Sequence, residues 1–336
     1  GMLSVMKKDN PSGNTSANSN PNSDKGAADK YKAFDSGRYD FMGLAKVMGI
    51  LTVVVTLACI AIMMVKGFRY GVDFAGGTEM QVKFVTAIDA AKVRVVAENQ
   101  GIGGVTVQEF GKGNEFLIRF EVIEGKNEKE TAEINSSTVS KMSAAIRSSF
   151  QTEGADVVRV DSVGAQVGSE LKRNGMLAMF YGIVLVLIYI GLRFDFRFSA
   201  GAVICLVHDV IVAVGVYVLL GKEVNVQILA AVLTIIGYSL NDTIVNYDRV
   251  RENMALFRGQ PLVKIMNRSI NDCLSRTILT SLTTFLTTLA LYIFATGVIV
   301  DFALVFGIGV ILGTYSSIYI ACPLVLVCDR YFPSKT

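Results

Sequence analysis

The sequence predicts a polytopic α-helical membrane protein with six transmembrane helices and a small α+β, ferredoxin-like domain between helices 1 and 2. Hydrophobic residues make up 51% of the 336 residues, which is too high a share for an ordinary soluble protein of this length. Six stretches carry almost no charge, and each is about long enough, at roughly 20 residues, to cross a bilayer. The polar region between the first two stretches shows the periodicities of a folded domain.

The distribution of Lys and Arg orients the six stretches in the membrane. The stretches are 48–65, 174–192, 199–220, 224–247, 277–300 and 302–328. Basic residues gather before the first stretch and after the second, fourth and sixth, while the links on the other side carry few. The positive-inside rule therefore predicts that both termini are cytoplasmic and that the polar region lies outside the cytoplasm. An even number of spans requires the same arrangement of the termini.

The chain divides into five predicted regions. Residues 1–40, rich in Asn, Ser, Gly and Lys, are expected to form a disordered cytoplasmic tail. A first transmembrane helix is expected over 41–66, a periplasmic α+β domain over 67–170, a five-helix bundle over 171–330, and a short cytoplasmic tail over 331–336. All five cysteines lie outside the polar domain, so no disulfide framework is expected there.

The polar region reads as alternating strands and helices. Strands are predicted at 79–85, 105–110, 115–121 and 156–163, with helices at 87–99 and 128–150. The order βαββαβ is that of a split-βαβ, ferredoxin-like sheet with its helices on one face. Asp73, Gly76 and Gly77 lie in the run GVDFAGGT that leads into the first strand. The paired glycines suit a turn with positive φ, and the run lacks the GxxxxGK[ST] spacing of a phosphate loop.

Asp242 is the residue most at odds with its surroundings, because it lies inside the fourth apolar stretch. A carboxylate within a membrane is costly unless it is paired, protonated or reached by water, so it marks a functional site by default. Arg276, which opens the fifth span, is the candidate partner. In one interpretation Asp242 alternates between a protonated state and an ion pair with Arg276. In the other, the two form a static pair that holds the helices together.

Three polar residues accompany this pair. Tyr238 lies one helical turn before Asp242, Asn241 lies beside it, and Thr280 lies one turn after Arg276. Their hydroxyl and amide groups could hold water and pass protons along, although threonines in a helix more often bond their own helix carbonyls. The same groups could ligate sodium, and the adjacent arginine favours protons as the coupling ion.

His208 and Asp209 interrupt the third span. A histidine titrates near neutral pH and suits a proton relay, while a buried His–Asp pair could equally fix helix packing. A single His and the lack of a CxxC motif predict no metal site. Nothing in the sequence indicates a cofactor, an enzymatic activity or a nucleic-acid partner.

These residues together resemble the SecF family of protein-export membrane proteins, which belongs to the RND superfamily. The resemblance rests on GVDFAGGT at 71–78, the His-Asp pair of the third span, IGYSLNDTIVNYDRVREN at 236–253 and LSRTILTSLTT at 274–284. It covers roughly residues 40–330 in order and spacing. One departure is the Asn246–Tyr247 pair, where family members often carry more apolar residues.

The resemblance implies a subunit of the bacterial Sec translocase, in the inner membrane, that uses the proton motive force. It implies partnership with a SecD-like six-span subunit, association with the SecYEG channel and YajC, and contact with the translocating preprotein. It also assigns Asp242 and Arg276 to the proton site. The alternative is an RND-type proton-coupled exporter of small molecules or lipids. The single copy of the six-span unit and the small outside domain favour protein export.

Overall fold

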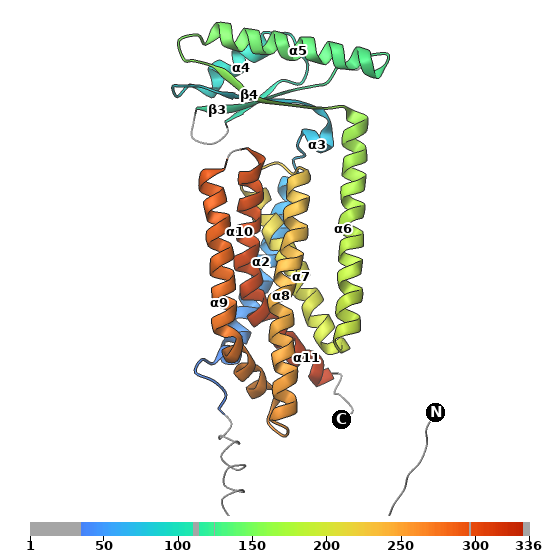
Figure 1. The fold of residues 1–336 in the computed structure, drawn as a ribbon, viewed down its shortest axis with the longest axis vertical. Helices are drawn as coiled ribbons and strands as arrows, with labels where there is room; N and C mark the ends of the chain where they lie inside the picture. Colours follow the sequence, from blue (N-terminus) through green and yellow to red (C-terminus); the bar gives the residue numbers. More distant parts are fainter. Residues whose placement is uncertain (1–34, 110–113, 124, 296, 332–336) are drawn as a thin grey trace, which may run out of the picture. The chain divides into compact units, whose positions relative to one another are not determined.

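The computed structural model describes residues 35–109, 114–123, 125–295 and 297–331. The two predicted tails lie outside the described residues, apart from 35–40 and Tyr331. Within the described part, six helical segments are long and apolar enough to cross a membrane (Figure 1), which confirms the predicted number of spans. These are α2 (Phe41–Lys66), α6 (Ala165–Arg193), α7 (Phe196–Leu219), α8 (Val226–Leu256), α9 (Leu262–Phe294), and α10 (Val298–Ser316), which continues through the π-helical turn η1 (Ser317–Ala321) into α11 (Cys322–Tyr331).

Several of these helices run further than the apolar stretches predict. The helix α6 begins at Ala165, ahead of the expected boundary at 170. The helix α8 continues to Leu256 and α9 already begins at Leu262. Most of the basic residues between the fourth and fifth apolar stretches therefore lie on a helix rather than in a loop. Ion pairs such as Arg249–Asp272 at 2.7 Å and Arg193–Asp248 at 2.7 Å hold these extensions in place.

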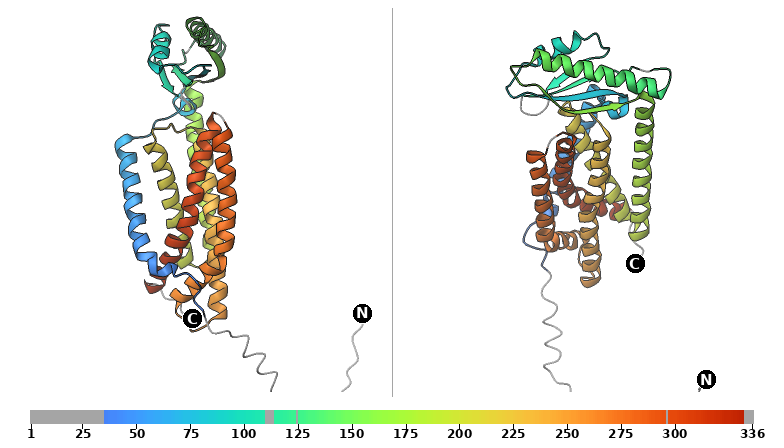
Figure 2. Two further views of the ribbon diagram at one scale, coloured as in Figure 1. Left: turned by 90° about the vertical axis from the view of Figure 1, so that its left-hand side faces the viewer. Right: turned by 45° about the horizontal axis from the view of Figure 1, so that its top comes forward.

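The membrane bundle is centred on α7, α8 and α10. Its main apolar cluster joins residues of α7, α8 and the turn η1, including Phe198, Leu240 and Ile318. The helix α6 lies at one edge of the bundle in Figure 1, and α2 lies at one edge in the left view of Figure 2. Most side chains of both helices are exposed. Apolar side chains exposed along a transmembrane helix are stable only against lipid or another membrane helix.

The inserted domain has a four-stranded antiparallel sheet with two helices. The strands are β1 (Gly77–Lys83), β2 (Thr106–Glu109), β3 (Glu115–Phe120) and β4 (Asp156–Val163), in the order β2-β3-β1-β4. The helices are α4 (Ala90–Glu98) and α5 (Glu128–Ser149). The predicted element order and ferredoxin-like fold are therefore confirmed. The core forms because alternate residues of the strands, such as Met80, Phe116 and Ile118, are buried against Met142 and Ile146 of α5.

A short helix that the sequence pattern did not predict lies between α2 and the sheet. This helix, α3 (Val72–Ala75), has Gly76 as its C-cap, and both Gly76 and Gly77 have positive φ, at 74° and 129°. Residues with a Cβ adopt these angles rarely, so the glycines let the chain turn from α3 directly into β1. Asp73 lies in the first turn of α3 and accepts a hydrogen bond from the backbone N–H of Val226 at 3.2 Å.

Candidate functional site

Asp242 lies about halfway along α8 and is 4% exposed. Its side chain is hydrogen-bonded to α9, where the Ser281 hydroxyl donates to Asp242 Oδ2 at 3.4 Å. This carboxyl group is therefore buried between two transmembrane helices with a weak polar contact. A proton that binds there neutralises a charge in a low-dielectric environment, so its arrival and departure change the energy of that helix contact.

Ser281 collects the polar groups around Asp242. It accepts hydrogen bonds from Tyr238 of α8, at 3.3 Å, and from Thr314 of α10, at 2.6 Å. Three helices therefore meet at one hydroxyl group next to the carboxylate. The sequence reasoning missed Ser281 and Thr314. The signal for Ser281 is its place on the buried face of α9, one turn after Thr277 and two turns before Thr288, all of which are buried.

The other predicted companions of Asp242 do not reach it. Arg276 is exposed, and within the described part of the chain no ion pair joins it to Asp242. Its guanidinium is within electrostatic range of the carboxylate without contact. Thr280 donates to the carbonyl oxygens of Arg276 and Thr277 on its own helix, at 3.0 and 3.1 Å. Asn241 is exposed. Of the predicted set, the structure brings only Tyr238 close, and it does so through Ser281.

Asp209 forms a second buried polar cluster. Its side chain is fully buried, and its Oδ2 atom accepts hydrogen bonds from Ser239 of α8 at 2.5 Å and from Ser316 of α10 at 2.7 Å. Its Oδ1 atom lies 2.9 Å from Nδ1 of His208, the preceding residue on α7. The carboxylate therefore joins α7 to α8 and α10, and its partner Ser316 is the last residue before the π-helical turn η1.

The two clusters share two helices, α8 and α10. Each takes a residue from α8 and a residue from the end of α10: Tyr238 and Thr314 near Asp242, and Ser239 and Ser316 near Asp209. A π-helical turn is rare and frequently marks a functional position, and here it follows Ser316 directly. A displacement of α8 relative to α10 would therefore change the surroundings of both carboxyl groups.

Asn246 adds a buried polar group one helical turn beyond Asp242. It is 1% exposed, and its Nδ2 atom has no hydrogen-bond partner among the described residues. A buried donor without a partner costs about 1–3 kcal/mol. The polar face that starts at Tyr238 and Asp242 therefore continues past the carboxylate.

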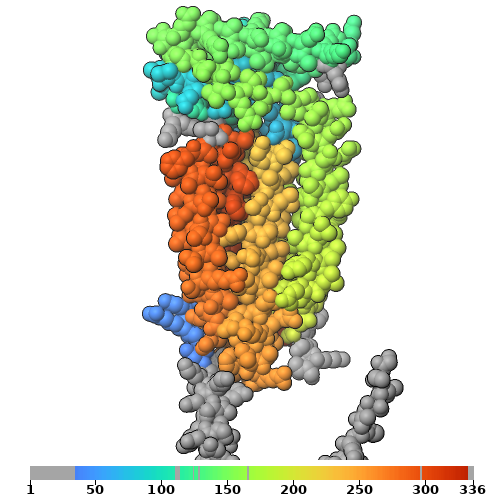
Figure 3. All heavy atoms as spheres, viewed as in Figure 1, coloured from blue at the N-terminus to red at the C-terminus, as the bar shows by residue number. Residues whose placement is uncertain are grey.

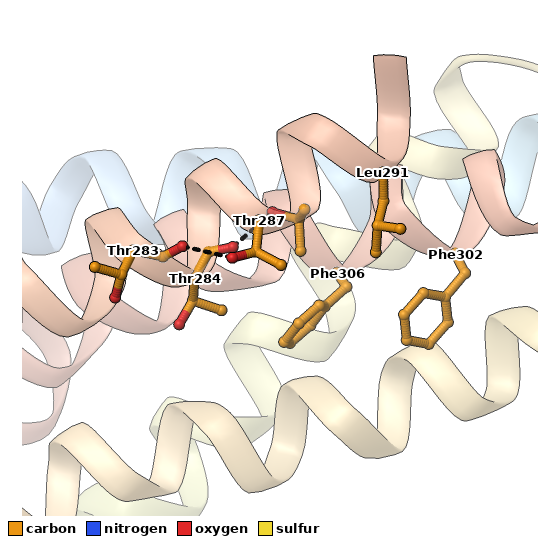
Figure 4. A pocket seen from close by; sticks show the side chains of 7 residues that line it. Thr283, Thr284, Thr287, Leu291, Phe302 and Phe306 are labelled. Atoms are coloured by element: carbon orange, nitrogen blue, oxygen red, sulfur yellow. Dashed lines mark hydrogen bonds between the residues drawn. The ribbon is translucent and has the colours of Figure 1, made fainter. Parts of the chain in front are cut away.

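A pocket of about 310 Å³ lies between α9 and α10, away from Asp242. Figure 4 shows it lined by threonines of α9 with Leu291, Phe302 and Phe306. The hydroxyl groups of Thr283 and Thr287 donate to carbonyl oxygens one turn earlier on their own helix, each at 2.9 Å. These hydroxyls are satisfied locally, so the pocket presents mainly methyl and aromatic groups.

The outer surfaces of α8 and α9 lie side by side on one face of the bundle (Figure 3). On α8 the exposed residues of this central part are small or polar: Thr234, Gly237 and Asn241. Small residues allow another membrane helix to approach closely. Among the described residues, no group of three or more His, Cys, Asp or Glu side chains is placed to bind a metal ion.

Two family models match the chain. The model described as "Protein export membrane protein SecD/SecF, C-terminal" matches residues 142–330, and the model described as "SecD/SecF GG Motif" matches residues 61–88. The first spans α8 and α9 with Asp242 and Ser281. The second spans α3 and the Gly76–Gly77 turn.

Several similar proteins carry the name protein translocase subunit SecF. The protein from Magnetococcus marinus is 44% identical over 291 residues, which cover 87% of this chain and 92% of the relative. The protein from Calditerrivibrio nitroreducens is 44% identical over 290 residues, covering 85% and 92%. The protein from Rickettsia rickettsii is 39% identical over 298 residues, covering 88% and 94%.

Two solved structures of SecDF have a similar fold. SecDF from Thermus thermophilus, a translocon-associated membrane protein, matches with a TM-score of 0.76 and 34% identity over 91% of this chain and 41% of its own. SecDF in a super-membrane-facing form matches with a TM-score of 0.61 and 35% identity over 88% of this chain and 39% of its own. The chain thus spans about two fifths of the SecDF polypeptide.

Proposed function

The chain belongs to the SecD/SecF family as a SecF-like subunit of the Sec protein translocase, and from this we propose that it uses the proton motive force to promote late steps of protein export. The observation that carries the proposal is the buried carboxyl group of Asp242, held between α8 and α9 by the hydroxyl of Ser281. Asp242 binds and releases the proton. The movement that follows at the contact between α8 and α9 is the mechanical output. The protein acts in transport rather than as an enzyme.

Arg276 has a place in this cycle although it does not touch Asp242 here. The exposed guanidinium is near enough to act on the carboxylate electrostatically. In the proposed cycle, loss of the proton leaves a charged carboxylate that attracts Arg276, and gain of the proton releases it. The hydroxyl groups of Tyr238 and Ser281 can form hydrogen bonds at the site in both states, because each can donate to or accept from a neighbour.

The proton motive force provides enough free energy for such a change. One elementary charge that crosses 100 mV releases about 2.3 kcal/mol. This amount shifts a two-state equilibrium about fifty-fold, at 1.4 kcal/mol for each factor of ten. A change of this size is sufficient to move the inserted domain between two positions.

The proposed setting is the bacterial inner membrane, with both termini in the cytoplasm and the inserted domain in the periplasm. The asymmetric distribution of Lys and Arg supports this orientation. We propose that the partner is a SecD-like six-span subunit, since the SecDF relatives extend well beyond the part that this chain matches. The SecYEG channel, YajC and the translocating preprotein complete the proposed assembly.

The test is export of a secreted precursor in cells that are depleted of their own copy and carry Asp242→Asn. Pulse-chase labelling measures the rate at which the precursor matures. Because Asn cannot take up a proton under these conditions, we expect the precursor to accumulate, and dissipation of the proton gradient should slow the unmodified chain to the same rate.

The matched control is Asp248→Asn on the same helix. Asp248 is 43% exposed and pairs with Arg193, so its change removes an aspartate from α8 without affecting the buried site. Normal export by Asp242→Asn at normal membrane levels would refute the proposed role. Such a result would leave export of small molecules or lipids as the alternative.

A further inference from the structure

The segment of residues 69–77 contacts the first turn of α8, the helix that carries Asp242. Backbone hydrogen bonds run from Val224 N to the carbonyl oxygen of Arg69, at 2.7 Å, and from Gly71 N to the carbonyl oxygen of Val224, at 2.9 Å. The Asp73 carboxylate accepts from Val226 N at 3.2 Å. These bonds join the link between α7 and α8 to the chain that enters the sheet.

The hydrogen bond from Val226 to Asp73 gives the backbone N–H of Val226 an acceptor that the helix itself cannot provide. The first N–H groups of a helix have no acceptor within it. The side chain of Asn225 accepts from Ile228 N at 3.2 Å, as an ordinary N-cap does. Asp73, from a distant part of the chain, provides the acceptor for Val226. A carboxylate at a helix N-terminus also interacts favourably with the helix dipole.

The same segment is packed tightly into the membrane bundle. Phe74 is 7% exposed and lies in an apolar cluster with Tyr217 of α7 and Ile228 of α8. Gly168 of α6 also packs closely against the segment, because a Cβ there would lie 3.1 Å from Gly76 N and 3.3 Å from the carbonyl oxygen of Asp73. The segment is therefore held by three transmembrane helices.

The segment leads into the central part of the sheet without a flexible linker. Strand β1 begins at Gly77 and pairs with both β3 and β4. At the other end of the connection, α8 is one continuous helix from Val226 to Leu256. Asp242 lies about 24 Å along its axis from Val226, at 1.5 Å of rise per residue. A rigid path thus runs from the buried carboxyl group to the central strand.

We propose that residues 69–77 form the joint through which α8 moves the inserted domain, and that Asp73 is the positioning residue that holds α8 to this joint. The inference rests on the proposed function, in which protonation of Asp242 displaces α8. It assigns to the run GVDFAGGT a mechanical role that a simple turn into the sheet does not have. Gly76 and Gly77 fix the exit direction, and Asp73 fixes the contact with the moving helix.

Export measured with two substitutions at Asp73 separates positioning from charge. Asp73→Ala removes the acceptor for Val226 N, whereas Asp73→Asn keeps a side-chain oxygen that can accept the same N–H. Loss of a helix-capping hydrogen bond shifts an equilibrium about fivefold. We therefore expect Asp73→Ala to lower the proton-stimulated part of export about fivefold, and Asp73→Asn to restore it.

The matched control is Asp89→Ala. Asp89 caps α4 in the inserted domain by accepting from Ala91 N at 2.9 Å, so its substitution removes the same kind of bond away from the bundle. Equal losses for Asp73→Ala and Asp89→Ala, or failure of Asp73→Asn to restore export, would overturn the joint. Equal losses would mean that Asp73 acts through domain stability, and failure of Asp73→Asn to restore export would mean that Asp73 acts through its charge.

Hydrogen–deuterium exchange of the purified chain shows in which segments a substitution changes local opening of the backbone. Asp242→Asn is introduced into the unmodified chain and into Asp73→Ala, and exchange is followed in α8 and in residues 69–77. We expect Asp242→Asn to alter exchange in both regions of the unmodified chain, and in α8 alone when Asp73 is Ala.

The outcomes distinguish the joint from the function on which it rests. A change that reaches residues 69–77 equally in both backgrounds, or never leaves α8, overturns the joint and leaves the role of Asp242 intact. Normal export with no change of exchange in α8 upon Asp242→Asn overturns the proposed function, and this inference with it.

Discussion

Asp209 offers the most direct test of what the buried polar groups contribute to the bundle. The substitution is Asp209→Ala, which removes the acceptor for Ser239 of α8 and Ser316 of α10 and the partner of His208. The side chain is fully buried, so water does not replace the hydrogen bonds that the substitution removes. Two bonds between different helices are lost at once.

The expected loss follows from the strength of such bonds. Hydrogen bonds between transmembrane helices contribute about 0.6 kcal/mol on average and up to about 1.7 kcal/mol. Two of them give a loss of about 1–3 kcal/mol in the free energy of unfolding. The competing effect is relief of the desolvation cost of a buried charge, which can make removal of an ion neutral or stabilising. Three donors around one carboxylate offset that cost, so we expect net destabilisation.

The assay is reversible unfolding of the purified chain in mixed micelles with increasing denaturing detergent. Asp195→Ala is the matched control, because Asp195 is exposed at the start of the same helix and makes no side-chain capping bond. Ser239→Ala with Ser316→Ala removes the same two bonds from the other side. The variant with all three substitutions, at Asp209, Ser239 and Ser316, should therefore lose no more stability than the variant with the two serine substitutions, because the same bonds are lost in both.

Two results would refute this reasoning. If Asp209→Ala is as stable as the unmodified chain, desolvation outweighs the hydrogen bonds. If the losses from Asp209 and from the two serines simply add, the residues do not act through each other. Either result would remove Asp209 as the contact that holds α7, α8 and α10 together.

Two further predictions concern Ser281 and Gly77. Ser281→Ala removes the hydroxyl that joins Asp242, Tyr238 and Thr314. We expect the free energy of unfolding to fall by about 0.6 kcal/mol and export to slow about threefold, which is the factor that corresponds to this energy. Unchanged pulse-chase kinetics would contradict this prediction. Gly77→Ala places a Cβ at a φ of 129° and 3.2 Å from the carbonyl oxygen of Phe120. We expect this substitution to destabilise the inserted domain by more than about 1 kcal/mol, so proteolysis of the domain should begin at a lower temperature. Gly101→Ala, which has open space around its Cβ, is the control for positive φ alone.

The elements of the fold could be read from the sequence because each depends on a local pattern. Long uncharged stretches mark transmembrane helices, and the strands of the inserted domain alternate buried and partly buried residues, as EFLIRF of β3 does. The helix extensions beyond the apolar stretches were not predicted. They are stabilised by ion pairs between α8 and α9, such as Arg249–Asp272, whose partners are distant in sequence.

The candidate site could be predicted only in part. An aspartate in an apolar stretch is visible in the sequence, since burial of a charge is costly wherever the helix packs. Its neighbours are not visible. The spacing along α9 predicts Thr280 and Arg276 as neighbours of Asp242, whereas in the structure a different face of that helix, with Ser281, lies toward Asp242.

The class of protein, the six spans, the order of elements in the inserted domain and the position of the unusual carboxyl groups all follow from the amino-acid sequence. These depend on composition and periodicity, which are properties of neighbouring residues. Which side chains meet is visible in the folded bundle alone: Ser281 with Asp242, Ser239 and Ser316 with Asp209, and Asp73 with the first turn of α8. The physical reason is that the rotation and depth of each helix are set by packing against the others, and that packing involves the whole bundle at once.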